Sequence, residues 1–349
     1  MTREQLQATD PSNMYGLIRG FPDQVNEAMA IGYNSGVRLA VRSVREIVLC
    51  GLGGSAIGGD LLKSYLADDL KVPFLVNRNY TLPKFVGPST LVIISSYSGN
   101  TEESNAAHRE AIKRRAKLLC ISSDGNTEKL ARAKKSPFIK IPGGLPPRAA
   151  LAYSFFPLLI TLSRAGLIKD RRKDILETIA LLAEKAAIYG ELNSDANPAL
   201  KLAEQLHGRL VAFYSSTERF DAVNTRWRGQ LAENGKTLSF GNVLPEMNHN
   251  ELVGWRVLTD LMRDTQVVFL RDKADHKRIQ VRMDVTREVL RRHTERVTEV
   301  YSEGRSLLAR IFSLVHFGDW TSYYLAILNG IDPTPVEVID FLKSELGKV

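Results

Sequence analysis

Alternation between short apolar runs and helical stretches is the feature that most restricts how this chain can fold. In the first half, strand-like runs occur in "REIVLC", "VPFLVN", "TLVIIS" and "AKLLCIS". Glycine-rich or polar turns and stretches of helical character follow most of these runs. Runs that are apolar at every position predict strands buried on both faces, as in a parallel sheet covered by helices on both sides. The first half therefore predicts a doubly wound α/β sheet.

The second half has the same kind of organisation. Strand-like runs occur in "RLVAFYSS", "TQVVFLRD" and "RVTEVYSEG", with helical stretches such as "ERFDAVNTRWRGQLAENG" and "HKRIQVRMDVTREVLRRH" between them. A chain of 349 residues is long enough for two domains with separate sheets. We predict two doubly wound, parallel-sheet α/β sandwiches in tandem, over residues 1–165 and 193–349, joined by a charged helical connector over 166–192.

Composition indicates an ordinary globular protein. Hydrophobic residues make up 44% of the chain and charged residues 25%, which are average values. The apolar runs are too short for a membrane span, and "MTREQLQATD" lacks the apolar segment of a signal peptide. Cys50 and Cys120 lie inside strand-like runs, which favours reduced core thiols. We expect a cytoplasmic protein that does not bind membranes.

The net charge of +8 raises the question of nucleic-acid binding. Lysine and arginine are scattered, with only short clusters such as "KRRAK" and "DRRKD". Neither cluster has interleaved aromatic residues, and the chain has no zinc-finger or helix-turn-helix signature. We therefore expect no nucleic-acid partner and instead an enzyme that attracts anionic metabolites.

A glycine-rich loop follows the first strand-like run. "GLGGSAIGGD" fits the pattern G-x-G-x-x-A of dinucleotide-binding folds. Those folds need an acidic residue at the end of the next strand to bind the ribose, and here "NRNY" places Arg78 there. Arginine suits a 2′-phosphate, so an NADP-dependent oxidoreductase remains an alternative.

A second loop, "SSYSGNTEES", contains several hydroxyl side chains at the end of a buried strand. Ser96, Ser98 and Thr101 lie just where a helix is expected to begin, at about Asn100. Free amides at a helix N-terminus and neighbouring hydroxyls can bind a phosphate dianion. A simple helix cap in a serine-rich turn would also explain the hydroxyls. The additional Ser55 in the glycine loop, across the same sheet edge, favours the phosphate site.

Two further residues suit proton transfer. Glu233 ends a helix in "GQLAENGKT", a segment whose spacing and preceding helix exclude a P-loop. His249 lies in the polar segment "LPEMNHNELVGW". A carboxylate base and an imidazole acid are the usual groups for such chemistry. A solvated helix end and a surface histidine are the alternatives. The histidines show no zinc-site spacing, so we expect no metal site.

Four segments in order resemble the bifunctional phosphoglucose/phosphomannose isomerases: "GLGGSAIGGD", "SYSGNTEE", "ENGKT…LPEMNHNE" and "DPTPVEVIDFLK". The resemblance runs from about residue 20 to the C-terminus. It implies two sugar-isomerase domains of the doubly wound type. It also implies an aldose–ketose isomerase that interconverts fructose 6-phosphate with glucose 6-phosphate and mannose 6-phosphate through an enediolate, without a cofactor.

The resemblance also implies roles for individual residues. Glu233 would move the proton between C1 and C2, and Arg148 would stabilise the enediolate. His249 would open the sugar ring from the neighbouring subunit of a homodimer, and Lys343 would assist at the ring oxygen or the C1 end. Thr334 lies in "DPTPVE" and receives no role. The sugar 6-phosphate and its neighbouring oxygens would be bound by Gly54, Ser55, Ser96, Ser98 and Thr101.

Two other functions are compatible with the same loops. A non-catalytic sugar-phosphate sensor would use the same phosphate site, although such proteins usually carry a DNA-binding segment and none is evident. An amino-sugar phosphate isomerase would share the fold and differ in its substrate.

Overall fold

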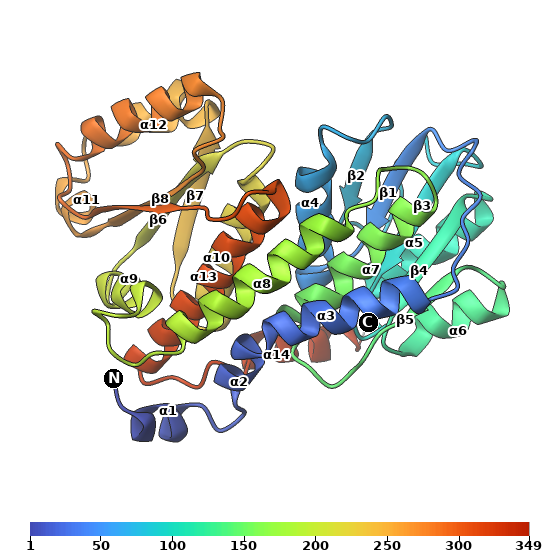
Figure 1. The fold of residues 1–349 in the computed structure, drawn as a ribbon, viewed down its shortest axis with the longest axis horizontal. Helices are drawn as coiled ribbons and strands as arrows, with labels where there is room; N and C mark the ends of the chain where they lie inside the picture. Colours follow the sequence, from blue (N-terminus) through green and yellow to red (C-terminus); the bar gives the residue numbers. More distant parts are fainter. Residues whose placement is uncertain (349) are drawn as a thin grey trace.

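The computed structural model describes residues 1–348, which contain two parallel β-sheets (Figure 1). The first sheet has the strand order β2-β1-β3-β4-β5 and the second β7-β6-β8-β9. The predicted pair of doubly wound α/β units is confirmed. The strands are β1 (Glu46–Cys50), β2 (Phe74–Asn77), β3 (Thr90–Ser95), β4 (Lys117–Ser122), β5 (Phe138–Lys140), β6 (Val211–Ser216), β7 (Ser239–Leu244), β8 (Gln266–Arg271) and β9 (Val297–Tyr301).

Helices cover both sheets and connect their strands. They are α1 (Arg3–Thr9), α2 (Met14–Arg19), α3 (Phe21–Asn34), α4 (Gly53–Leu66), α5 (Glu102–Lys113), α6 (Gly125–Ala133), α7 (Leu151–Arg164), α8 (Arg172–Tyr189), α9 (Pro198–Leu206), α10 (Asp221–Glu233), α11 (Thr259–Asp264), α12 (Lys277–Leu290), α13 (Leu307–Leu328) and α14 (Glu337–Leu346). Three short 3₁₀ helices are η1 (Pro147–Ala149), η2 (Glu246–His249) and η3 (Glu251–Gly254).

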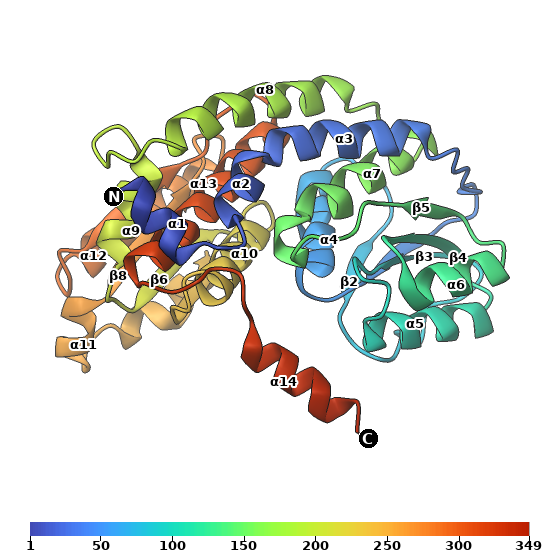
Figure 2. The same ribbon diagram turned by 90° about the horizontal axis from the view of Figure 1, so that it is seen from below.

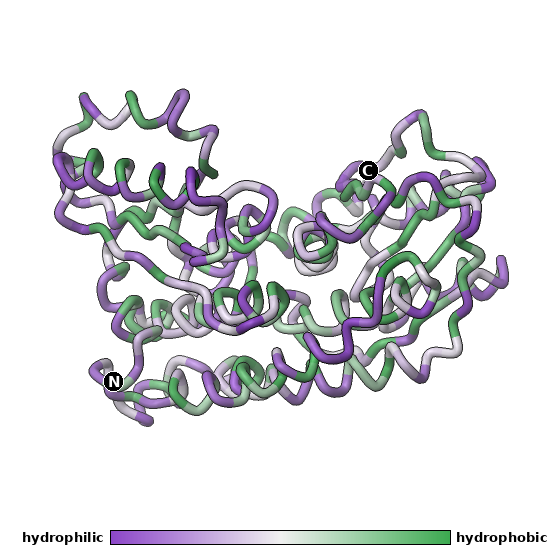
Figure 3. The backbone as a smooth tube through the Cα atoms, turned by 45° about the horizontal axis from the view of Figure 1, so that its top comes forward, coloured by the Kyte–Doolittle hydropathy of each residue, from purple (hydrophilic) through white to green (hydrophobic). Residues whose placement is uncertain are grey.

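The central strands are apolar throughout because both of their faces are buried. Ile47 and Leu49 of β1 belong to the core under α4 and α7, whereas Val48 and Cys50 face the core under α5. Figure 3 shows hydrophobic segments mainly in the interior and hydrophilic segments mainly at the periphery. Cys50 and Cys120 are buried free thiols, as the sequence predicts.

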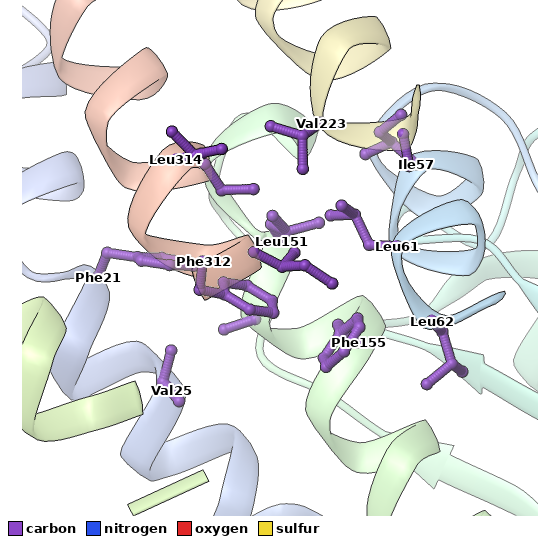
Figure 4. Close-up of a cluster of buried hydrophobic side chains, with 14 of the residues drawn as sticks. Phe21, Val25, Ile57, Leu61, Leu62, Leu151, Phe155, Val223, Phe312 and Leu314 are labelled. Atoms are coloured by element: carbon purple, nitrogen blue, oxygen red, sulfur yellow. The ribbon is translucent and has the colours of Figure 1, made fainter. Parts of the chain in front are cut away.

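One large core joins the two halves of the molecule. Side chains from α3, α4, α7, α10 and α13 meet in it, as Figure 4 shows for Phe21, Ile57, Phe155, Val223 and Phe312. Helices α3 and α8 lie side by side along this core (Figures 1 and 2). The contact between α4 of the first half and α10 of the second is the one that matters for the site.

The connector predicted over residues 166–192 contains α8, which packs against α3 and α13. Helix α9 follows as a separate element in the second half. The domain boundaries at 165 and 192 stay a prediction.

Strand β7 was not predicted from the sequence. Its segment, "SFGNVL", is only partly buried and includes Gly241 and Asn242 in place of a continuous apolar run. It pairs with β6 at the sheet edge, where a Cβ at position 241 would lie 2.6 Å from the carbonyl oxygen of Phe213. Glycine is needed there because the neighbouring backbone approaches so closely.

Within residues 1–348, no helix is both long enough and apolar enough to cross a membrane. The long apolar helix α13 is buried in the protein core over most of its length. The C-terminal helix α14 differs, because it projects away from the body (Figure 2) and has no buried residue over its described length.

Candidate active site

The glycine loop connects β1 to α4 and places Gly54 and Ser55 in the first turn of that helix. Ser55 is buried, and its Oγ accepts a hydrogen bond of 3.1 Å from the backbone N–H of Tyr97. Gly54 lies against η1, because a Cβ there would lie 2.6 Å from the carbonyl oxygen of Pro147. The glycine loop therefore contacts the hydroxyl loop on one side and η1, the segment that carries Arg148, on the other.

The hydroxyl loop connects β3 to α5. This helix begins at Glu102, close to the start predicted at about Asn100. Ser96 is buried, and its Oγ donates a 3.1 Å hydrogen bond to Oγ1 of Thr101. Ser98 is exposed, and its Oγ accepts from the N–H of Asn100 at 3.3 Å. Within residues 1–348, no side chain caps α5. The first-turn amides of α5 are consequently available to an anion.

Both loops lie at the carboxyl edge of the first sheet. β1 and β3 are neighbours in that sheet, and the chain order reverses between them. Open α/β sheets bind ligands at such a switch point.

Arg148 and Glu233 come from different halves of the chain and meet in a cavity of about 180 Å³. Arg148 Nη1 lies 3.5 Å from Glu233 Oε2. The arginine side chain is 5% exposed and the glutamate side chain 35% exposed. The walls of the cavity come from α4, η1 and α10, together with the end of β2: Gly53, Gly54, Ile57, Arg78, Arg148, Thr225, Arg226, Gly229, Gln230 and Glu233.

Neutral oxygens hold the guanidinium of Arg148. Its Nε donates to Asn234 Oδ1 at 2.7 Å, and its Nη2 donates to the carbonyl oxygens of Pro333 and Thr334 at 2.6 and 2.8 Å. Burial lowers the pKa of Arg148, while the nearby Glu233 acts in the opposite direction. A buried cation with neutral partners keeps a strong field in the cavity.

Two predicted residues lie outside this cavity. His249 is exposed in η2, after β7. Lys343 is exposed on α14, with its Nζ 3.5 Å from Asp340 Oδ1. In the described part of a single chain, neither side chain lines the cavity with Glu233.

Three buried polar residues at or next to the cavity were not predicted from the sequence: Arg226, Gln230 and Asp319. The most informative signal is Asp319, which lies in the middle of the otherwise apolar helix "SLLARIFSLVHFGDWTSYYLAILNG". A buried carboxylate needs a partner, and in the structure Arg226 supplies it at 2.8 Å. Arg226, Gln230 and Glu233 follow one another at helical spacing along α10 and all line the cavity. The helical spacing from the predicted Glu233 could have revealed Arg226 and Gln230.

A structural comparison supports the fold. A glucose-6-phosphate isomerase like protein from Thermus thermophilus superposes with a TM-score of 0.66. The match covers 97% of this chain and 98% of that one, at 19% sequence identity. At that identity the likeness concerns the fold alone.

Sequence comparisons identify the family. Residues 195–346 match the family described as the bacterial phospho-glucose isomerase C-terminal SIS domain. The chain is 40% identical over 337 residues to the bifunctional phosphoglucose/phosphomannose isomerase of Caldicellulosiruptor bescii, covering 96% of this chain and 99% of the relative. It is 36% identical over 305 residues to the protein of the same name from Aquifex aeolicus, covering 87% and 91%. The chain therefore belongs to the bifunctional phosphoglucose/phosphomannose isomerase family.

Proposed function

We propose that this protein is an aldose–ketose isomerase that interconverts fructose 6-phosphate with glucose 6-phosphate and mannose 6-phosphate. The observation that carries the proposal is the carboxylate of Glu233, 3.5 Å from the buried guanidinium of Arg148 in a cavity between the two halves. The names of the two relatives support the same reaction.

The chemistry requires a base next to a cation. Glu233 removes the proton from the carbon next to the carbonyl and returns it to the neighbouring carbon. The intermediate is an enediolate, whose negative charge Arg148 stabilises without having to move. Return of the proton to either face of the planar C2 gives the glucose or the mannose configuration.

The phosphate group of the substrate binds at the two loops of the first sheet. Thr101 and Ser98 lie beside the open N-terminus of α5, and Ser96 donates to Thr101. Ser55 is joined to the same loop through Tyr97. Hydroxyls and helix amides are suitable donors to a phosphate dianion. Gly54 lies between this site and Arg148, so that the sugar can extend from the loops toward Glu233.

The active site is completed by a second copy of the chain in a homodimer. His249 and Lys343 are exposed in the single chain, and no histidine is among the described residues that line the cavity. Helix α14 also exposes Val338, Phe341 and Leu342, and an isolated helix of ten residues is only marginally stable in water. A subunit contact would bury these side chains.

The thiols and the net charge suit an enzyme of the cytoplasm. Two buried, free thiols are compatible with a reducing compartment of that kind. The substrate is a small anion, which fits the net charge of +8.

The test is a coupled assay with fructose 6-phosphate, performed with and without a chelator. We expect turnover to glucose 6-phosphate and mannose 6-phosphate in both conditions. Glu233→Gln should lower kcat about 10²- to 10⁴-fold, because the base is lost. The same variant should retain substrate affinity by calorimetry, because the phosphate contacts remain.

The alternatives give different results in the same panel. Binding of fructose 6-phosphate without turnover by the wild type would identify a sugar-phosphate sensor. Turnover confined to glucosamine 6-phosphate would identify an amino-sugar isomerase. Saturable binding of NADP would revive the oxidoreductase. Each of these outcomes would overturn the proposal.

A further inference from the structure

The two buried arginines at the cavity have different partners. Arg226 donates to both carboxylate oxygens of Asp319, with Nε–Oδ1 and Nη2–Oδ2 distances of 3.1 and 2.8 Å. Gln230 also donates to Asp319 Oδ1, at 2.8 Å. The charge of Arg226 is therefore compensated inside the protein.

Arg148 lacks such a carboxylate within residues 1–348, apart from the proposed base Glu233. Its other acceptors are an amide oxygen and two backbone carbonyls. Arg226 fixes the backbone here as well, because its Nη2 donates to the carbonyl oxygen of Arg148 at 3.0 Å. The guanidinium is thus held in place without being neutralised.

Asn234 is the side chain that both holds the guanidinium of Arg148 in place and leaves its charge uncompensated. It is fully buried and follows Glu233 directly in the sequence. Its Oδ1 accepts from Arg148, and its Nδ2 donates to Ser322 Oγ at 3.0 Å. Ser322 Oγ in turn donates to the carbonyl oxygen of Asp319 at 2.8 Å. This chain of hydrogen bonds fixes the orientation of the amide, with its oxygen toward Arg148.

We propose that Asn234 is a positioning residue, which anchors Arg148 through a neutral acceptor and so keeps the positive charge available to the enediolate. The inference rests on the proposed isomerase function. A carboxylate at the same position would accept the same hydrogen bond but form an ion pair with Arg148. The chemical identity of residue 234, and not only its size, then determines the rate.

The central experiment compares Asn234→Asp with Asn234→Ala. We expect Asn234→Asp to lower kcat about 10²-fold, as when a donor to an oxyanion is lost, with little change in KM. Asn234→Ala should lower kcat less, about 10-fold, because Arg148 keeps its charge and its two carbonyl acceptors. A merely structural role predicts the opposite order, because the alanine variant loses both hydrogen bonds.

Asn224→Asp is the matched control. Asn224 is also buried on α10, and its Oδ1 accepts from the Nε of Arg228 at 3.1 Å. It does not line the cavity with Glu233 in the described part of the chain. This variant should lower the melting temperature but leave kcat of the folded enzyme within about twofold of the wild type. A loss of kcat equal to that of Asn234→Asp would overturn the proposal.

A binding measurement separates this inference from the isomerase proposal. The probe is an aldonohydroxamate with a terminal phosphate, which mimics the enediolate, measured by calorimetry. In Asn234→Asp, the Kd of the hydroxamate should increase about 10-fold or more beyond any change in the Kd of inorganic phosphate. Equal weakening of both, or of neither, overturns the positioning role. A wild type that binds the hydroxamate tightly but does not isomerise fructose 6-phosphate would refute only the proposed function.

Discussion

At the scale of single residues, burial decides which ionisable groups keep their ordinary chemistry. Arg148 remains a buried cation because carbonyl and amide oxygens surround it. Cys50 and Cys120 are buried among apolar side chains, and desolvation raises the pKa of each thiol to about 12. These thiols therefore stay protonated and unreactive. Burial has the opposite effect on the pKa of His108, which lies beside Cys120.

His108 is buried on α5, with its Nε2 3.6 Å from Cys120 Sγ. Burial lowers the pKa of His108 from 6.5 to about 4. As the pH falls from 6.5 towards 4, the unfolded chain binds a proton that the folded protein does not bind. The free energy of unfolding therefore decreases across this window.

We expect His108→Gln to reduce this acid sensitivity. Urea midpoints at pH 7 and pH 5 should differ less in the variant than in the wild type. The variant retains some sensitivity, because burial also lowers the pKa of His316, to about 3. His207 is exposed, so His207→Gln is the control and should show the wild-type difference. An unchanged difference in His108→Gln would contradict this account.

At the scale of elements, the hydroxyl loop depends on one glycine. Gly99 has a φ of 72°, and a Cβ there would lie 1.6 Å from the carbonyl oxygen of Asp124. Its own carbonyl accepts from Thr127 and Asn105, which joins the loop to α5 and α6. The close contact holds Ser96, Ser98 and Thr101 in one arrangement.

We expect Gly99→Ala to displace this loop and raise KM for fructose 6-phosphate about 10-fold or more, with a smaller effect on kcat. Gly36 is the control, because its φ is 65° and a Cβ there meets nothing within 4 Å. Gly36→Ala should cost only the backbone strain of about 1–2 kcal/mol and leave KM unchanged. Steady-state kinetics and thermal melts on both variants test this, and a wild-type KM in Gly99→Ala would disprove it.

At the scale of the whole molecule, the proposed dimer predicts complementation between inactive variants. Glu233→Gln and His249→Asn are mixed after partial unfolding and refolded together. If His249 serves the neighbouring subunit, each mixed dimer has one intact site, and the mixture recovers about a quarter of wild-type activity. If His249 serves its own subunit, each mixed dimer has one defect in each site. No recovery would then be seen, despite exchange of subunits confirmed by mass spectrometry.

Local pattern along the chain was enough to predict most of the elements and both loops. Apolar runs such as "TLVIIS" predict buried parallel strands, because side-chain burial follows the local period of a strand. The loops after β1 and β3 were predicted to lie near each other for a second reason, because both follow strands that end at the carboxyl edge of one parallel sheet. The half-buried edge strand β7 was not predicted, because Gly241 and Asn242 interrupt its apolar pattern.

Which polar side chains meet became evident only in the folded molecule. Arg148 and Glu233 come together because α4 packs against α10 in a core shared by both halves. Asn234 reaches Arg148 for the same reason, although it is distant from it in sequence. Local periodicity encodes which face of a helix is buried, but the contact between two helices depends on how all the side chains between them pack. His249 and Lys343 are exposed in the single chain, and in the proposed homodimer their contacts depend on the packing of two chains, which local periodicity does not encode either.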